Sequence, residues 1–379
     1  MGKMTSVQRL MMAFQGKEPD RVPVFGIFLE WAWMQVYGPD SFMDYGLDPE
    51  RIAKLMVWTC KEMECDMGVA WPDFCITDEA IAEASGMHLP GSRRKDYHVQ
   101  DCHRLYEGDP IKDMHYGNPL IKTMKDAEKL KPADPYTHGR FPVVLKALEL
   151  ANKELKGEYV MGGICDHPIA IAGKLMGWTQ TFMAIQNDIE LYKKVEDVII
   201  KTSYEMTKAM IKAGATALFS HTVTPTYMGS DFFFENPVWA QAEDPPQLFK
   251  RIFEEFQVGV GLHACSVGPW EQGIPAWKTM LDHIPAFFMA EYGGADALAR
   301  AKEQLAPATV MGNIHPVDVM LHGSPSDVEE ACIELIKKCA PGGRYGLGPG
   351  CMLPLDVPFE NMKAMIDSAK KYGEYPIRL

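Results

Sequence analysis

The sequence contains no apolar run that approaches the roughly 18 residues required by a membrane-spanning helix. Its amino terminus also lacks the long apolar core and the small-residue cleavage site of a signal peptide. Basic residues are the minority, because 38 Lys and Arg stand against 51 Asp and Glu and the net charge is −13. Phosphate binding needs clustered cations. We therefore expect a cytoplasmic protein with no membrane and no nucleic-acid partner.

A disulfide framework is also missing. The nine cysteines are scattered along the chain and odd in number. Without an export signal, such usage is typical of reduced thiols, most of them buried and a few able to bind a metal ion. Cys60, Cys332 and Cys339 fall within helical patterns, so we expect them in the core.

The sequence is rich in short apolar runs that alternate with helical patterns. Its 379 residues, 47% of them apolar, suit one α/β barrel with insertions. Eight runs read as strands, at 22–28, 67–73, 159–165, 215–221, 258–263, 285–291, 309–314 and 344–348. This alternation predicts a parallel (β/α)8 TIM barrel. The long gap between the second and third runs predicts an insertion at 86–140 within a single domain, 1–379.

Residues suited to metal binding and acid–base chemistry stand at the ends of these runs. In barrels of this kind the chemistry lies at the carboxyl ends of the strands. The candidates are Asp73, Cys165, Asp166, His167, His221, His263, Cys265, Glu291, Asn313, His315 and Cys351. We expect these side chains to share one rim of the barrel.

His263 and Cys265 are the most informative of these residues. Residues two apart on a strand point to the same side, so both can face one site if the strand continues to Cys265. A catalytic zinc ion keeps three protein ligands, such as imidazole nitrogen and thiolate sulfur, and one open position. Cys351, which follows the last run after Gly-Pro-Gly, is the best third ligand. Buried hydrophobic cysteines are the alternative interpretation.

Several segments resemble the uroporphyrinogen decarboxylase superfamily. They are QRLMMAFQGKEPDRVPV (8–24), GGICDHPIAIAGKLMGW (162–178), GNIHP (312–316), GSPSDVEEA (323–331) and GPGCMLPLDVPFENMKAMIDSAKKYGEYP (348–376). The resemblance covers nearly the whole chain and implies the same (β/α)8 barrel. The superfamily contains porphyrinogen decarboxylases and zinc-dependent, corrinoid-linked methyltransferases.

The decarboxylase motifs are largely absent from this sequence. An arginine-rich motif should follow the first strand, where FLEWAWMQVYG (28–38) stands. The decarboxylase tyrosine should fall within 168–177, which contains none, and the late Gly-His-Gly motif reads Gly-Pro-Gly (348–350). Asp73 alone matches a catalytic residue of that branch. The departures disfavour a decarboxylase.

The methyltransferase pattern of His-x-Cys followed far downstream by Cys matches at His263, Cys265 and Cys351. The resemblance thus implies Zn²⁺ as a cofactor bound by these three residues. Ser266 departs from the glycine usual in the family at that position, which leaves the subfamily open.

The resemblance implies methyl transfer between a small substrate and the cobalt of a corrinoid (cobalamin). The chain has no Asp-x-His-x-x-Gly cobalamin motif, so a separate corrinoid protein is the expected partner. Aromatic residues within 25–38 could wall a pocket for an aryl methyl ether, which favours O-demethylation, or could equally form core. The alternatives are transfer from methylcorrinoid to a coenzyme M-like thiol or tetrahydrofolate, a porphyrinogen-type decarboxylase, and a catalytically silent barrel.

Three further rim residues, Asp73, His221 and Glu291, are expected to be catalytic. His221 or Glu291 could also be a fourth metal ligand or orient a ligand histidine. Asp166 could be functional or cap a helix, and His315 could serve the site or a turn. The sequence leaves open the methyl donor and acceptor, and it leaves open whether the chain forms a homodimer.

Overall fold

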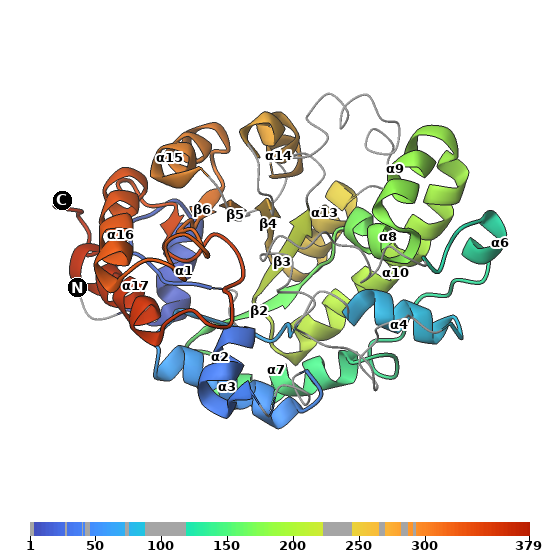
Figure 1. Cartoon of the computed structure of the whole chain (residues 1–379), viewed down its shortest axis with the longest axis horizontal. Helices are drawn as coiled ribbons and strands as arrows, with labels where there is room; N and C mark the ends of the chain where they lie inside the picture. Colours follow the sequence, from blue (N-terminus) through green and yellow to red (C-terminus); the bar gives the residue numbers. More distant parts are fainter. Residues whose placement is uncertain are drawn as a thin grey trace.

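A computed structural model describes residues 4–26, 29–39, 41, 46–72, 76–87, 119–222, 245–264, 270–281, 287–290 and 293–379. Figure 1 shows helices arranged around a central group of strands, with both chain ends on the same side of the molecule. This is the layered arrangement expected when a parallel sheet is covered by the helices that connect its strands.

Seven parallel strands form one sheet in chain order. They are β1 (Met67–Val69), β2 (Val160–Ile164), β3 (Ala217–Thr222), β4 (Val260–Ala264), β5 (Phe287–Ala290), β6 (Thr309–Met311) and β7 (Tyr345–Gly346). Their apolar residues are buried on both faces, as is typical of parallel strands covered by helices.

The eighth place in the barrel is occupied by the chain around Val24. Val24 bridges Leu347 in parallel, just beyond β7, and the Phe25 N–H donates to the Leu347 carbonyl at 3.0 Å. On its other side the Val24 carbonyl accepts from Asp66 N–H at 2.8 Å, next to β1. These bonds close the ring, so the predicted (β/α)8-type barrel is confirmed, and each of the eight predicted runs overlaps one of its segments.

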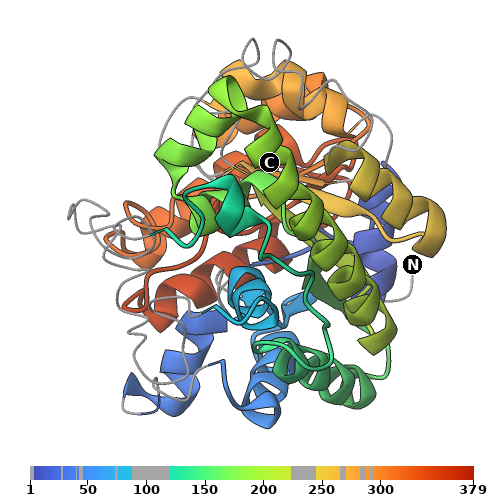
Figure 2. The same cartoon turned by 90° about the vertical axis from the view of Figure 1, so that its right-hand side faces the viewer.

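Figure 1 shows the helices of the described chain around the strands, and in Figure 2 helices cover most of the side that faces the viewer. They are α1 (Ser6–Phe14), α2 (Leu29–Tyr37), α3 (Pro49–Lys61), α4 (Ile76–Ala84), α6 (Met124–Ala127), α7 (Phe141–Leu155), α8 (Pro168–Met176), α9 (Trp178–Asn187), α10 (Ile189–Ala213), α13 (Pro245–Phe256), α14 (Ile274–Leu281), α15 (Gly294–Gln304), α16 (Pro325–Cys339) and α17 (Phe359–Tyr372). A short 3₁₀ helix, η3 (Trp270–Gly273), precedes α14.

Local sequence explains where several helices begin and end. Thr5 caps α1 and Ser324 caps α16, each in a reciprocal capping box, and Pro325 occupies the first turn of α16. The Asp188 side chain caps the 25-residue α10, which ends at Gly214 with φ of +115°, a conformation that favours glycine. No helix of the described chain combines the length and apolarity needed to cross a bilayer.

A buried ion cluster ties the amino-terminal side of the barrel together. Asp66 directly precedes β1 and is fully buried. Its carboxylate accepts from the Arg9 guanidinium of α1, from Arg21 Nη1 at 2.9 Å and from Val24 N–H at 2.7 Å. A buried carboxylate needs such partners, because an unpaired buried charge is strongly destabilising. The cluster therefore joins α1, the first strand segment and β1.

The core cysteines lie as predicted. Cys60, Cys332 and Cys339 are fully buried, and burial raises the pKa of the Cys332 and Cys339 thiols to about 12. They are therefore protonated at neutral pH. Much of the predicted insertion at 86–140 lies outside the described residues, so the insertion and the single-domain organisation stay predictions.

Candidate functional site

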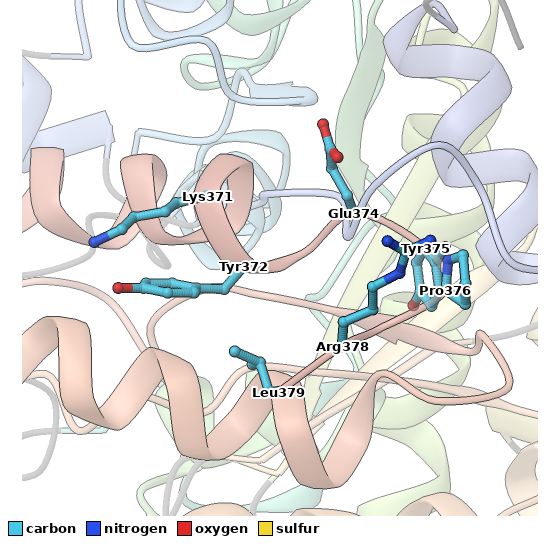
Figure 3. Close-up of a pocket in the computed structure, with 7 residues that line it drawn as sticks. All are labelled: Lys371, Tyr372, Glu374, Tyr375, Pro376, Arg378 and Leu379. Atoms are coloured by element: carbon cyan, nitrogen blue, oxygen red, sulfur yellow. The ribbon is translucent and has the colours of Figure 1, made fainter.

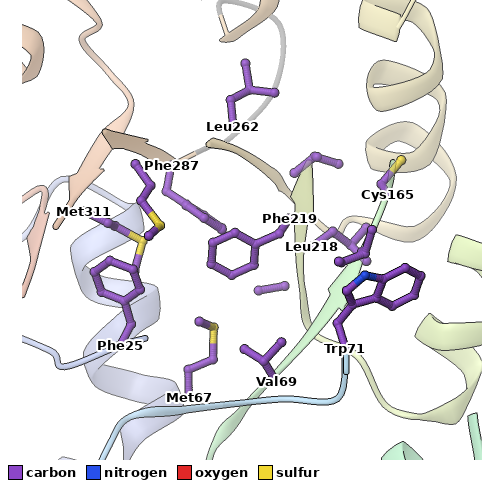
Figure 4. Packing of buried hydrophobic residues seen from close by; sticks show 14 of the residues in the cluster. Phe25, Met67, Val69, Trp71, Cys165, Leu218, Phe219, Leu262, Phe287 and Met311 are labelled. Carbon is purple, nitrogen blue, oxygen red and sulfur yellow. The ribbon is translucent and has the colours of Figure 1, made fainter. Parts of the chain in front are cut away.

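An aromatic layer lies inside the barrel across β3, β4 and β5. Phe219 is the register partner of Gly261, and a Cβ on Gly261 would lie only 2.0 Å from the ring of Phe287. The Phe219 and Phe287 rings meet edge to face, with centroids 4.6 Å apart. Figure 4 shows both rings among the side chains that fill the barrel. Because Gly261 has no side chain, the two rings can close over it.

His263 lies directly above this layer. It follows Gly261 by two residues on β4, so its side chain is on the same, inward side of the strand. Its register partners are His221 on β3 and Met289 on β5. Only 2% of His263 is exposed. The imidazole therefore stands at the carboxyl end of the barrel interior, above an apolar layer.

The segment after β7 carries Cys351 to the same end of the barrel. Pro349 bridges Ile314 in parallel, and the Gly350 N–H donates to the Ile314 carbonyl at 2.9 Å. A Cβ on Gly348 would lie 2.4 Å from the Phe25 carbonyl oxygen, so only glycine permits this close approach. The Gly-Pro-Gly sequence thus lets the chain pass across the closing seam of the barrel before Cys351.

The two side chains meet there. Cys351 Sγ lies 3.5 Å from His263 Nε2, and Cys351 is only 4% exposed. Tetrahedral zinc with bonds of roughly 2.3 Å to sulfur and 2.0–2.1 Å to nitrogen would hold two such atoms about 3.6 Å apart. The same distance is compatible with a hydrogen bond between thiol and imidazole. The geometry of this pair therefore fits two ligands of one zinc ion.

The other predicted site residues are only partly placed. Cys265, Asp73 and Glu291 lie outside the described residues, and of His221 only the backbone position in β3 is described. Within the described part of the chain, no three His, Cys, Asp or Glu side chains gather as a metal site. The zinc ion, its full ligand set and the roles of these four residues stay predictions.

Asp166 belongs to a buried polar cluster instead of capping a helix. The N-cap of α8 is His167, so the capping interpretation is wrong, and Asp166 accepts a hydrogen bond from the Thr77 hydroxyl of α4. Burial raises the pKa of Asp166 to about 6, although Lys174 and Thr77 favour its charged form. Lys174 Nζ also lies 3.6 Å from an Asp78 carboxylate oxygen.

Thr77, Asp78 and Lys174 were missed in the sequence, because they stand within helical patterns where polar residues are usually solvent-exposed. All three are largely buried, at 1% exposure for Thr77, 0% for Asp78 and 10% for the Lys174 side chain. Asp78 and Glu79 are acidic residues in the first turn of α4. Acidic residues are common there because they favour a helix amino terminus, so nothing in the sequence indicated that Asp78 is buried.

The remaining strand-end candidates are buried in the core or hydrogen-bonded within a turn. His167 is fully buried, and burial lowers its pKa to about 3, so it is neutral at physiological pH. Cys165 is also fully buried, and burial raises its pKa to about 12. The Asp318 N–H donates to His315 Nδ1 at 2.8 Å, which supports the turn interpretation of His315. Asn313 is 3% exposed, beside the β6 end.

The aromatic residues after the first strand form packing between helices. Trp31 is fully buried, and its ring lies 6.3 Å from that of Trp58 on α3 and 6.2 Å from that of Phe359 on α17. Its indole N–H donates to the Val357 carbonyl at 2.8 Å. Trp33 is also fully buried. These contacts favour the core interpretation over the wall of an aryl ether pocket.

A separate cavity of about 440 Å³ lies near the carboxyl terminus and is lined by residues of the last helix and tail (Figure 3). Its polar groups serve structural contacts: the Tyr372 hydroxyl donates to Glu329 at 2.7 Å and the Tyr375 hydroxyl donates to the Ala340 carbonyl at 3.0 Å. None of the predicted site residues lines this cavity.

Comparison with known proteins places the chain in a family. The uroporphyrinogen decarboxylase (URO-D) family model matches residues 107–372. The methylcobamide:CoM methyltransferase MtbA of Methanosarcina acetivorans is 26% identical, over 83% of this chain and 90% of the relative. The methylcobamide:CoM methyltransferase MtaA of Methanosarcina barkeri is 23% identical, over 98% of this chain and 99% of the relative.

A solved structure has the same fold. A methyltransferase from Methanosarcina mazei superposes with a TM-score of 0.73 at 21% identity, and the match covers 98% of this chain and 99% of that one. The barrel, the family match and these relatives agree with the resemblance seen in the sequence. The chain belongs to the uroporphyrinogen decarboxylase family, on its corrinoid-linked methyltransferase branch.

Proposed function

We propose that this chain is an enzyme that transfers a methyl group from the cobalt of a methylated corrinoid to the sulfur of a small thiol. The two relatives support this direction, because both are named methylcobamide:CoM methyltransferases. They favour the thiol alternative over O-demethylation of an aryl methyl ether. The packing of Trp31 against Trp58 and Phe359, and the burial of Trp33, weaken the sequence argument for the ether.

The contact between His263 Nε2 and Cys351 Sγ carries the proposal. Two zinc-ligating residue types, far apart in the chain, meet at the barrel end where such enzymes work. Together with Cys265 they would hold Zn²⁺ and leave one position for substrate. When bound, zinc would lower the pKa of a thiol at that position and keep it as a nucleophilic thiolate near neutral pH.

The chain's own residues would bind and orient the thiol. His263 and Cys351 are buried, and the Phe219 and Phe287 rings pack on the side toward the amino-terminal end of the barrel. These rings would exclude water from that side. The thiol sulfur bonds to the methyl carbon while the carbon–cobalt bond breaks and leaves its electron pair on cobalt. The thiol proton departs, and we assign Asp73, His221 or Glu291 as its acceptor or as a support for the ligands.

The corrinoid would be presented by a separate protein that docks over the carboxyl end of the barrel. This assignment rests on the missing cobalamin motif in the sequence and on the corrinoid substrate in the relatives' names. The cytoplasmic location and a homodimer remain predictions from the sequence.

The first experiment combines turnover with metal content. Wild type incubated with methylcobalamin and 2-mercaptoethanesulfonate should form the methyl thioether, and elemental analysis should find about one zinc per chain. Cys351→Ala should lose both the zinc and at least ~10²-fold of the activity while staying folded, because a rim metal does not hold the core together.

Cys332→Ala is the matched control, because Cys332 is buried in α16, away from His263 and Cys351. We expect this variant to keep both the zinc and the turnover of the wild type. Zinc-loaded wild type that methylates no thiol but demethylates an aryl methyl ether would reverse the proposed direction. Wild type without zinc after chelator-free purification would remove the metal from the proposal.

A further inference from the structure

The Phe287 ring is held between two other aromatic rings. It is the first residue of β5. Phe14 of α1 stacks on it with centroids 5.6 Å apart and planes within 11°, and Phe219 meets it edge to face. Such aromatic pairs contribute beyond their buried area and fix ring orientation. Phe287 is therefore a rigid part of the barrel interior and is only 2% exposed.

A cavity of about 210 Å³ lies on the other side of this ring. Most of its lining is apolar and includes Met11 and Phe14 of α1, Phe253 of α13 and Phe287. The remaining lining residues are Gln15, Thr216, Ala217, Gln257 and Gly259. Ala217 and Phe287 are the first residues of β3 and β5, and Gly259 directly precedes β4. The cavity therefore lies at the amino-terminal end of the barrel, opposite to His263.

The strand geometry places Phe287 as the partition between this cavity and the candidate site. Its ring atoms occupy the space where a Gly261 side chain would be, 2.0 to 2.3 Å from that Cβ position. His263 follows Gly261 by two residues on the same side, which is roughly 6–7 Å along a strand. The ring thus lies one layer beneath the imidazole.

We infer that Phe287 is a specificity-determining residue, which closes the site beneath His263 and restricts the substrate to short thiols. This inference rests on the proposed function. A thiol whose sulfur lies beside His263 and Cys351 cannot extend toward the amino-terminal end, because the ring is there. Its chain must point to the carboxyl mouth, where the methylated corrinoid has to approach. A long alkyl chain therefore competes with the methyl donor for the same space.

The test replaces the partition and compares two thiols. Wild type should prefer ethanethiol to 1-hexanethiol in kcat/KM with methylcobalamin as the methyl donor. Phe287→Ala removes one of the two rings beneath His263 and should open a path toward the amino-terminal cavity. The ratio should then move toward 1-hexanethiol by at least about tenfold, the discrimination that a single methylene can supply in an apolar pocket. Equilibrium binding of both thiols by calorimetry should shift in the same direction and needs no turnover.

Phe288→Ala is the matched control on the next residue of β5. The Phe288 ring packs on Trp277 of α14, outside the barrel, with centroids 5.6 Å apart, so its loss should leave the ratio unchanged. If Phe287→Ala does not fold, Phe287→Leu provides a milder change that should shift the ratio in the same direction.

The outcomes separate this inference from the function on which it rests. Folded Phe287 variants with the wild-type preference in both binding and turnover would overturn the inference while leaving thiol methylation intact. A wild type that binds thiols but methylates none would overturn the proposed function, and the binding ratio would still decide whether Phe287 closes the site.

Discussion

Asp166 shows how much a residue's surroundings add to its position. Its place after the third predicted strand indicated a rim residue, but residue type alone could not distinguish a helix cap from a buried acid. In the fold it lies 4% exposed against Thr77, with Lys174 and Asp78 as the charged groups that influence it. Burial is the largest of these influences and disfavours the ionised carboxylate.

This environment predicts a pH-dependent stability. The folded-state pKa of about 6 lies above the ordinary value of 3.8, so the unfolded chain releases the proton first. Stability should therefore fall as pH rises from about 4 to about 6, by on the order of 3 kcal/mol from this group. Asp166→Asn should lack this decrease. Urea unfolding of both proteins at pH 4.5 and 7.5 measures it, and parallel pH profiles would contradict the assignment.

The sequence predicted the helices and strands best, although the ends of the strands differ from the ends of the predicted runs. The second run was predicted at 67–73, whereas β1 ends at Val69. Ala70 and Trp71 continue the apolar pattern because they are 1% and 5% exposed, not because they belong to the strand. Hydrophobic runs report burial, and a buried loop extends the pattern beyond the last strand hydrogen bond.

The contacts between α1, the first strand segment and β1 depend on Asp66. Asp66→Asn should destabilise the fold by about 3–5 kcal/mol, because Arg9 and Arg21 would lose a buried partner. Asp367→Asn is the matched control: its carboxylate is 48% exposed and pairs with Lys363 within α17, where a loss below ~0.5 kcal/mol is expected. Urea midpoints of the two variants check this difference, and equal midpoints would mean that the cluster is energetically minor.

In the whole molecule, the barrel closes next to the candidate site, where the segment around Val24 meets the segment from Leu347 to Cys351. Val24 and Leu347 close the ring. The next residue, Gly348, lies so close to Phe25 that a Cβ there would be 2.4 Å from the Phe25 carbonyl oxygen, and the chain then reaches Cys351. The position of Cys351 beside His263 therefore depends on how the first and last segments of the barrel meet. Disturbing this closure should affect the stability of the fold and the binding of the proposed zinc ion together.

Gly348→Ala tests this coupling, because the added methyl would lie 2.4 Å from the Phe25 carbonyl oxygen. We expect a lower melting temperature and weaker zinc retention during dialysis against a chelator. Gly346→Ala is the control on the same side of the chain, since its nearest contacts would be 3.4 Å from Met311 and 3.5 Å from Phe25, within ordinary van der Waals range. Unchanged zinc retention in a destabilised Gly348→Ala would separate closure from the site.

Local patterns were sufficient to predict the barrel and the buried cysteines and to propose His263 and Cys351 as ligands, because periodicity and strand-end chemistry are encoded in neighbouring residues. The tertiary structure alone decided which of those residues meet. His263 and Cys351 are 88 residues apart, and their 3.5 Å contact exists only because the ring closes. The buried environment of Asp166 and the Phe287 partition likewise join segments far apart in the chain, whose distances no local pattern specifies.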